Sequence, residues 1–130
     1  MIIQDVYLED WDWHVTVYYA VDTYYIEDIL SEIKALGADT HNIISTEELI
    51  SKWYDVGLTY SNLKSKRSVL LIGISTCPAE FQNTFDHEKG HLAMHIAERY
   101  NIDLYGEEFQ YLTGEIGRAM YPVAKTFLCN

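Results

Sequence analysis

Three histidines stand four residues apart in the segment 85–100, at His87, His91 and His95, and Glu88 follows the first of them. The pair His87 and His91 matches the pattern H-E-x-x-H. On a helix, residues four apart lie one turn apart on the same face, so both imidazoles can reach one ion. Zinc binds neutral imidazole nitrogens, and a catalytic zinc site leaves one position open for water. Glu88 would then be the general base that takes a proton from the zinc-bound water and passes it on.

The position of Glu88 on the expected helix supports this chemistry. At about 100° per residue, Glu88 falls inside an apolar stripe that consists of Phe81, Phe85, Leu92 and Ile96. An ionised carboxylate on a buried helix face costs several kcal/mol unless another group compensates its charge. A metal ion and its water are one such compensation. The alternative is that the two histidines flank the edge of the core and Glu88 pairs with an Arg or Lys.

His95 is not predicted to be a metal ligand. Eight residues separate His95 from His87, which corresponds to a rise of about 12 Å along a helix. Two nitrogens on one zinc ion must lie within about 4 Å of each other. We therefore expect His95 to support the ligands or to line the pocket, with packing at the core edge as an equal alternative. Gly90 costs a helix about 1 kcal/mol relative to alanine, which is tolerable where another backbone passes close.

The third ligand must come from another part of the chain, and the candidates are Glu107, Glu108 and Glu115. A short turn over 101–106 would fold the last helix back, antiparallel to the histidine helix. Glu108 shares a helical face with Tyr111 and Glu115 that is expected to look inward, whereas Glu107 suits an N-terminal charge in solvent. Glu108 is thus favoured over Glu107, and Glu115 comes last. Tyr111 is a nominee for steadying an oxyanion, although core packing is the commoner role for such a residue.

Part of the sequence resembles a known family. The residues that carry the resemblance are Thr84, His87, Glu88, Gly90, His91 and Glu108. Their arrangement resembles the minimal gluzincin-type zinc metallopeptidases, including the ImmA/IrrE-like group, with the pattern T-x-x-H-E-x-G-H and a glutamate ligand on the following helix. The resemblance covers about residues 67–122. The chain is also similar to small proteins of Bacteroides-type phages and mobile elements. The resemblance implies a zinc site made by His87, His91 and Glu108, with Glu88 as the general base.

The elements that must position these residues alternate between strand and helix patterns. Strands are predicted at 1–8, 14–21 and 69–74, the last as a strand buried on both faces. Helices are predicted from Asp22 to Gly37, behind the capping pair Ser45 and Glu48, from Pro78 through the histidines, and from Glu107 to about Arg118, with Pro122 ending helical continuation. The turn-rich segment 57–68 is interpreted as a solvated loop. The expected fold is α+β, in one domain spanning 1–130: a small mixed sheet of about three strands with a zincin-like core of H-E-x-x-H helix plus glutamate helix.

Composition limits the classes of partner. Nine basic and twenty acidic residues give a formal charge of −11, which argues against proteins that grip nucleic-acid phosphates or adsorb to anionic lipid. No secretory signal or membrane span is visible, so a cytoplasmic protein with free Cys77 and Cys129 is expected. Trp11 and Trp13, beside an acidic turn, are expected to pack at a hairpin end, with a partner-binding tip as the alternative.

The expected function is that of a zinc-dependent metallopeptidase acting on a peptide or protein substrate, in which Glu88 activates the zinc-bound water. The alternative is a non-enzymatic acidic interaction or antagonist protein whose metal site is structural or vestigial.

Overall fold

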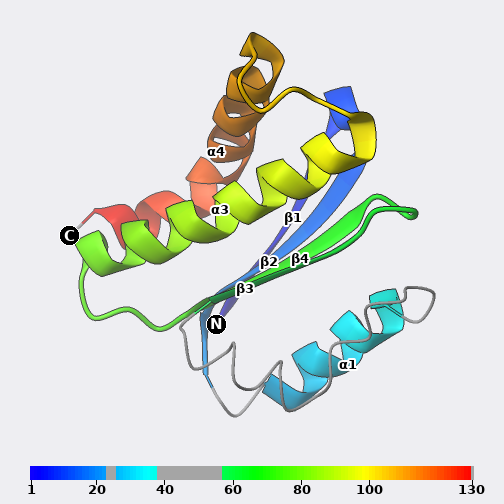
Figure 1. Ribbon diagram of the computed structural model, residues 1–130. Helices are drawn as coiled ribbons and strands as arrows, with labels where there is room; N and C mark the ends of the chain where they lie inside the picture. Colours follow the sequence, from blue (N-terminus) through cyan, green and yellow to red (C-terminus); the bar gives the residue numbers. More distant parts are fainter. Residues whose placement is uncertain (23–25, 38–56, 130) are drawn as a thin grey trace.

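A four-stranded mixed sheet forms the centre of the protein, with helices on both of its faces (Figure 1). The computed structural model describes residues 1–22, 26–37 and 57–129. The elements are β1 (Ile2–Leu8), the 3-10 turn η1 (Glu9–Trp11), β2 (Trp13–Val21), α1 (Ile26–Gly37), β3 (Gly57–Asn62), β4 (Arg67–Gly73), α3 (Pro78–Tyr100) and α4 (Glu107–Leu128). The expected α+β class with a mixed sheet is confirmed, although the sheet has four strands and not about three. The helix expected behind Ser45 and Glu48 lies outside the described residues.

The strands lie in the order β1-β2-β4-β3. β2 and β4 are parallel, whereas β1 and β3 each pair antiparallel with their neighbour. The central strand β4 is buried on both faces, as its continuous apolar run predicted. Its Val69 and Leu71 join the apolar cluster under α1, and its Leu70 and Ile72 join the cluster under α3 and α4.

The segment 57–68 was expected to be a loop, and this prediction is wrong for 57–62 and for 67–68, the last two of which belong to β4. Residues 57–62 form β3, and only the residues between β3 and β4 form the turn. Leu58 and Tyr60 are buried against the α1 side of the sheet. The alternation of apolar Leu58 and Tyr60 with small polar residues is the period-two signal of a strand, and the many turn-forming residues around it obscured that signal.

The last helix is longer than expected. α4 continues to Leu128, with Pro122 inside it. Proline removes one helical hydrogen bond and crowds the preceding turn, at a cost of about 3 kcal/mol. Beyond Pro122, Ala124 is fully buried, and the ring of Phe127 stacks on Tyr19 with centroids 5.5 Å apart. Packing of this last stretch against the sheet therefore offsets the cost of the proline.

The two long helices form the expected antiparallel pair over one face of the sheet, joined by a short turn that begins at Asn101 (Figure 1). α3 packs against β3, β4 and α4, whereas α4 packs against α3 and β1. Since β1 and β3 lie at opposite edges of the sheet, the two flanks of α3 face different partners. This division decides which residues can meet the histidines.

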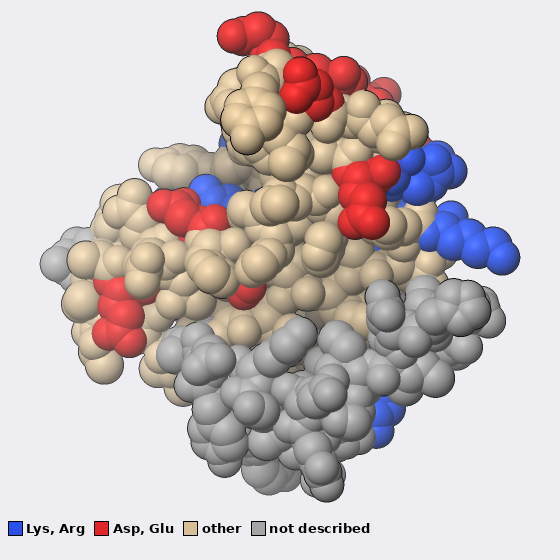
Figure 2. All heavy atoms as spheres, in the orientation of Figure 1, with Lys and Arg blue, Asp and Glu red and all other residues tan. Residues whose placement is uncertain are grey.

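Other features of the described residues bear on the sequence-based expectations. Trp11 and Trp13 are buried, which confirms packing at the hairpin end. Cys77 and Cys129 are free and exposed. No helix in the described segments combines the length and apolar character needed to cross a membrane. Figure 2 shows acidic side chains spread over the surface in view, with Lys and Arg gathered mainly along one side.

Candidate metal centre

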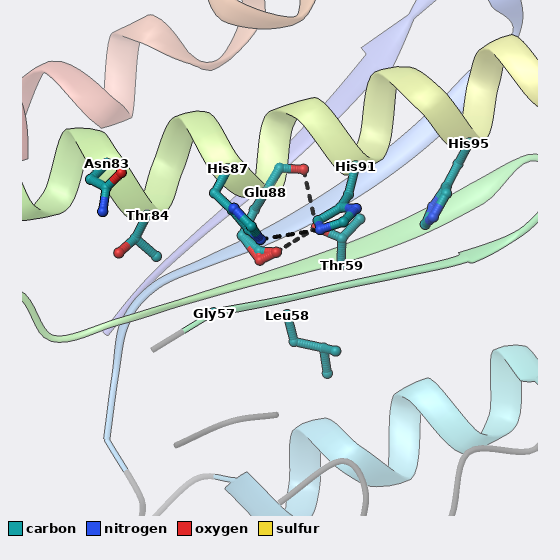
Figure 3. A pocket seen from close by; sticks show the side chains of 9 residues that line it. All are labelled: Gly57, Leu58, Thr59, Asn83, Thr84, His87, Glu88, His91 and His95. Carbon is teal, nitrogen blue, oxygen red and sulfur yellow. Dashed lines mark hydrogen bonds between the residues drawn. The ribbon is translucent and has the colours of Figure 1, made fainter. Parts of the chain in front are cut away.

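His87 and His91 point their side chains toward each other on one face of α3 (Figure 3). Their Nε2 atoms lie 3.2 Å apart. Two nitrogens bound to a tetrahedral zinc at about 2.0–2.1 Å lie roughly 3.3 Å from each other. Both side chains are exposed, so an ion can reach them. The histidine pair fits zinc without a change of helix geometry.

Glu88 completes a compact group of three possible ligands. One oxygen of its carboxylate and one nitrogen of each histidine all lie within 4.8 Å of one another. Glu88 is only 3 % exposed, as its place in the apolar stripe predicted. The hydroxyl of Thr59 lies 3.3 Å from Oε1 of Glu88 and 3.1 Å from its backbone oxygen, and it donates to both. Thr59 on β3 thus holds the carboxylate beside the histidines.

Gly57 allows β3 to approach α3 at this point. A Cβ atom at Gly57 would lie 3.0 Å from Cγ and Oε2 of Glu88 and 3.0 Å from Cγ2 of Thr84. Such contacts are tighter than side chains normally accept. By contrast, a Cβ at Gly90 would meet no described atom within 4 Å. The close approach of a backbone that Gly90 was expected to permit occurs at Gly57.

A pocket of about 700 Å³ opens above these residues, and its lining residues are Gly57, Leu58, Thr59, Asn83, Thr84, His87, Glu88, His91 and His95 (Figure 3). Both α3 and the edge strand β3 contribute. His95, which was expected to support the ligands or to line the pocket, does line it, and so does Thr84 of the resembling motif. The arrangement places two imidazoles and a carboxylate at the wall of a cavity large enough for part of a peptide.

The residues expected from the last helix are not brought to this pocket. Within the described segments, the group of possible metal ligands contains neither Glu107, Glu108 nor Glu115. Glu107 and Glu108 are exposed, so Glu108 does not look inward as expected. Glu115 pairs with Arg118 on its own helix. Tyr111 is 58 % exposed and lies beside the ring of Trp11, so it is not placed to steady an oxyanion at the histidines.

The rotation of α3 about its own axis explains why the glutamates of α4 do not reach the histidines. Nζ of Lys89 lies 3.7 Å from the position of a Cβ on Gly117, so Lys89 faces α4. At about 100° per residue, His87 and His91 are each turned by about 200° from Lys89 and face the opposite flank. Glu108 also precedes Gly117 by nine residues, which is about 13 Å along the axis of α4. Folding the last helix back antiparallel was predicted correctly, but it packs on the wrong side of α3 for Glu108 to reach the histidines.

His95 lies on the histidine side of α3, one turn beyond His91. Its Nδ1 is 2.7 Å from the hydroxyl of Ser61 on β3. Burial lowers the pKa of His95 below its ordinary value, and the neighbouring His91 lowers it further, while Glu98 acts in the opposite direction. The surroundings of His95 therefore disfavour its charged form.

Sequence patterns did not identify Gly57, Thr59 and Ser61 as site residues. These three residues alternate along β3 and contact Glu88 or His95 on α3. Their only local signal was the period-two pattern within a turn-rich segment. These contacts between β3 and α3 join residues 27 to 34 positions apart in the chain, from Gly57 with Thr84 to Ser61 with His95, and no local pattern reports them.

Comparisons of the chain with protein-family models, curated proteins and solved structures find no match. The assignment of a metal centre therefore depends on the chain's own residues: an imidazole pair at zinc-ligand spacing, with a buried carboxylate between strand and helix.

Proposed function

We propose that this protein is a zinc-dependent metallopeptidase in which His87 and His91 hold the metal and Glu88 is the general base. The observation that carries the proposal is the 3.2 Å separation of the two Nε2 atoms beside the carboxylate of Glu88. The resemblance of the segment from Thr84 to His91 to gluzincin-type peptidases supports the same function.

The chemistry follows from these three side chains. Zinc, when bound, would polarise the carbonyl of a peptide bond and increase the acidity of water. Glu88 accepts a proton from the water that attacks the carbonyl carbon and transfers it to the nitrogen of the leaving amine. The C–N bond breaks, and the products are a carboxylic acid and an amine. Thr59 holds the carboxylate by its hydrogen bond, so Glu88 is oriented before substrate arrives.

Metal analysis tests the metal half of this proposal. After loading with zinc and dialysis, we expect one zinc per chain in the wild-type protein and a loss of bound zinc in His87→Ala. His14→Ala is a matched control, because His14 is also exposed but lies on β2. Wild-type protein that retains no zinc under these conditions would overturn the proposal.

The variant Glu88→Gln tests the catalytic half. Glutamine keeps the size of the side chain but cannot accept the proton. If Glu88 is the base, the variant keeps its zinc and loses cleavage of an unstructured protein such as casein. A variant that loses zinc as well would make Glu88 a ligand. Full cleavage by the variant would exclude Glu88 as the base.

A further inference from the structure

A chain of hydrogen bonds runs through the sheet and ends at His95, on the wall of the candidate site. Nε1 of Trp13 on β2 donates to Oγ of Ser68 on β4 at 2.8 Å. Oγ of Ser68 lies 2.6 Å from Oγ of Ser61 on β3. Oγ of Ser61 in turn lies 2.7 Å from Nδ1 of His95. The chain thus links three strands to the histidine helix.

The hydrogen-bond donor at the start of the chain sets its direction. The indole nitrogen of Trp13 can only donate, so Ser68 accepts. Ser68 is 2 % exposed, and in the described part of the protein its own proton has Ser61 as its hydrogen-bond partner. Ser68 therefore donates to Ser61, and Ser61 donates to Nδ1 of His95. Since Nδ1 accepts, the proton of the neutral imidazole is on Nε2.

The reverse direction would leave a buried group without a partner. If Nδ1 of His95 carried the proton, Ser61 would donate to Ser68, and the proton of Ser68 would have no acceptor among the described residues. An unsatisfied buried hydroxyl is costly. Burial lowers the pKa of His95 and disfavours the form with both nitrogens protonated, and the hydrogen-bond chain then selects between the two neutral tautomers.

His95 stands between two pockets. It lines the metal pocket, and it also lines a second pocket of about 550 Å³ together with His91. The second pocket is apolar over much of its wall, through Met94, Ala97, Ile102 and Leu104. Met94 and Leu104 are 50 % and 41 % exposed, so both present apolar surface at this pocket. His91 and His95 line both pockets, so a peptide that extends from the histidine pair into the second pocket passes beside these two side chains.

We propose that His95 is a substrate-binding residue whose Nε2–H donates a hydrogen bond to a backbone carbonyl oxygen of a peptide, while a large apolar side chain of that peptide occupies the second pocket. The inference rests on the proposed function and adds a substrate class to it, namely peptides with a large apolar residue beside the cleaved bond. Ser61 and Ser68 are positioning residues, because they act on the substrate only through the orientation and tautomer of His95. No hydrogen bond within the described residues engages Nε2, which leaves that nitrogen available to the ligand.

The first test is the tautomer of His95 in the wild-type protein. Nitrogen-15 NMR of the imidazoles distinguishes the two neutral forms, and we expect His95 to carry its proton on Nε2, with or without zinc. In Ser61→Ala, which removes the donor to Nδ1, we expect this preference to weaken. A wild-type His95 protonated on Nδ1 overturns the inference.

The second test uses two thiol probes on zinc-loaded protein. Mercaptoacetyl-leucinamide has a thiol for the metal, a carbonyl for His95 and a leucine side chain for the second pocket, whereas mercaptoethanol has only the thiol of these groups. We expect His95→Ala to weaken the binding of the leucinamide probe about 2- to 10-fold, which is the range of one neutral hydrogen bond. The affinity for mercaptoethanol should stay unchanged. His95→Gln, which keeps an N–H donor, should restore part of the lost affinity.

The outcomes separate this inference from the proposed function. If the wild-type protein binds zinc but His95→Ala binds both probes as the wild type does, the role of His95 is overturned and the metal site stands. If neither probe binds and no zinc is retained, the proposed function itself fails. Leu104→Ala should reduce the preference for the leucinamide probe over mercaptoacetyl-glycinamide, and an unchanged preference excludes the second pocket as the site of the apolar side chain. If His95→Ala does not fold, Ser61→Ala should show the same selective loss of affinity for the leucinamide probe. Wild-type affinity of that variant for both probes counts against the role of His95.

Discussion

Gly57 and Glu88 are so close that any side chain at position 57 would press on the carboxylate of the candidate site. A Cβ there would lie 3.0 Å from both Cγ and Oε2 of Glu88. The edge strand therefore determines where the carboxylate lies relative to the histidines. This contact is absent from the H-E-x-x-H pattern itself, and it provides a direct way to displace Glu88 without changing His87 or His91.

We expect Gly57→Ala to impair cleavage more than zinc binding. The added methyl group displaces Glu88 and its bond from Thr59, while His87 and His91 are untouched. Overpacking of this kind destabilises a fold by about 1–3 kcal/mol, which urea unfolding can measure. Gly114→Ala is the control, because a Cβ at Gly114 meets nothing within 4 Å. The free energy of unfolding of this variant should increase by about 0.5–1 kcal/mol. Equal effects of the two substitutions would contradict the close contact.

Glu108→Gln should leave zinc binding unchanged. Glu108 is exposed, and it is not in the group of possible ligands formed by His87, Glu88 and His91. His91→Ala, in contrast, should weaken zinc binding by more than about 100-fold, since even outer residues of a zinc site can affect affinity 10- to 100-fold. Competition with a chelating dye measures both affinities. A large loss in Glu108→Gln would show that α4 supplies a ligand after all.

Acid should destabilise the zinc-free protein in part through His95. Burial is the main cause that lowers the pKa of His95, with a smaller effect of His91 and an opposing effect of Glu98. The unfolded chain therefore takes up this proton at a higher pH than the folded chain does, and lowering the pH favours unfolding. The contribution of His95 to stability is fully present above the unfolded pKa of about 6.5, and it is lost as the pH falls through the folded value.

Urea unfolding in the presence of a chelator, at several values between about pH 7.5 and pH 5, measures this effect. We expect His95→Gln to reduce the pH dependence of the free energy of unfolding. His14→Gln, the same substitution at an exposed position on β2, is the matched variant. The same pH dependence in His95→Gln and in the wild type would rule out His95 as its source.

Pro122→Ala should stabilise the protein. α4 runs through Pro122, which therefore leaves one helical bond unmade. Alanine restores that bond, although it also gives the unfolded chain more freedom, which offsets about 0.4–1 kcal/mol of the gain. We expect a net increase of about 2–2.6 kcal/mol in the free energy of unfolding. Tyr121→Ala at the neighbouring exposed position should not stabilise the protein, and a loss of stability in Pro122→Ala would mean that the helix requires the proline.

Local patterns predicted the parts of this protein that depend on neighbours in the chain. The apolar run of β4, the start of α3 at Pro78 and the burial of Glu88 within its stripe all follow from periods of two or 3.6 residues. The same periodicity placed His87 and His91 on one face, and the rise of the helix predicted that His95 lies too far from His87 to share an ion with it. In each case, a single element carries the whole signal.

Tertiary packing decided the rest. The sequence could predict that α3 and α4 form an antiparallel pair, but not which flank of α3 would meet α4, because both flanks carry side chains that can face a neighbour. The sheet order places β3 at the edge beside the histidines and β1 at the edge beneath α4. Gly57, Thr59 and Ser61 thereby become part of the site and Glu108 does not. Contacts between residues far apart in the chain determine which elements pack against each flank of α3. The local sequence around each residue does not predict these contacts.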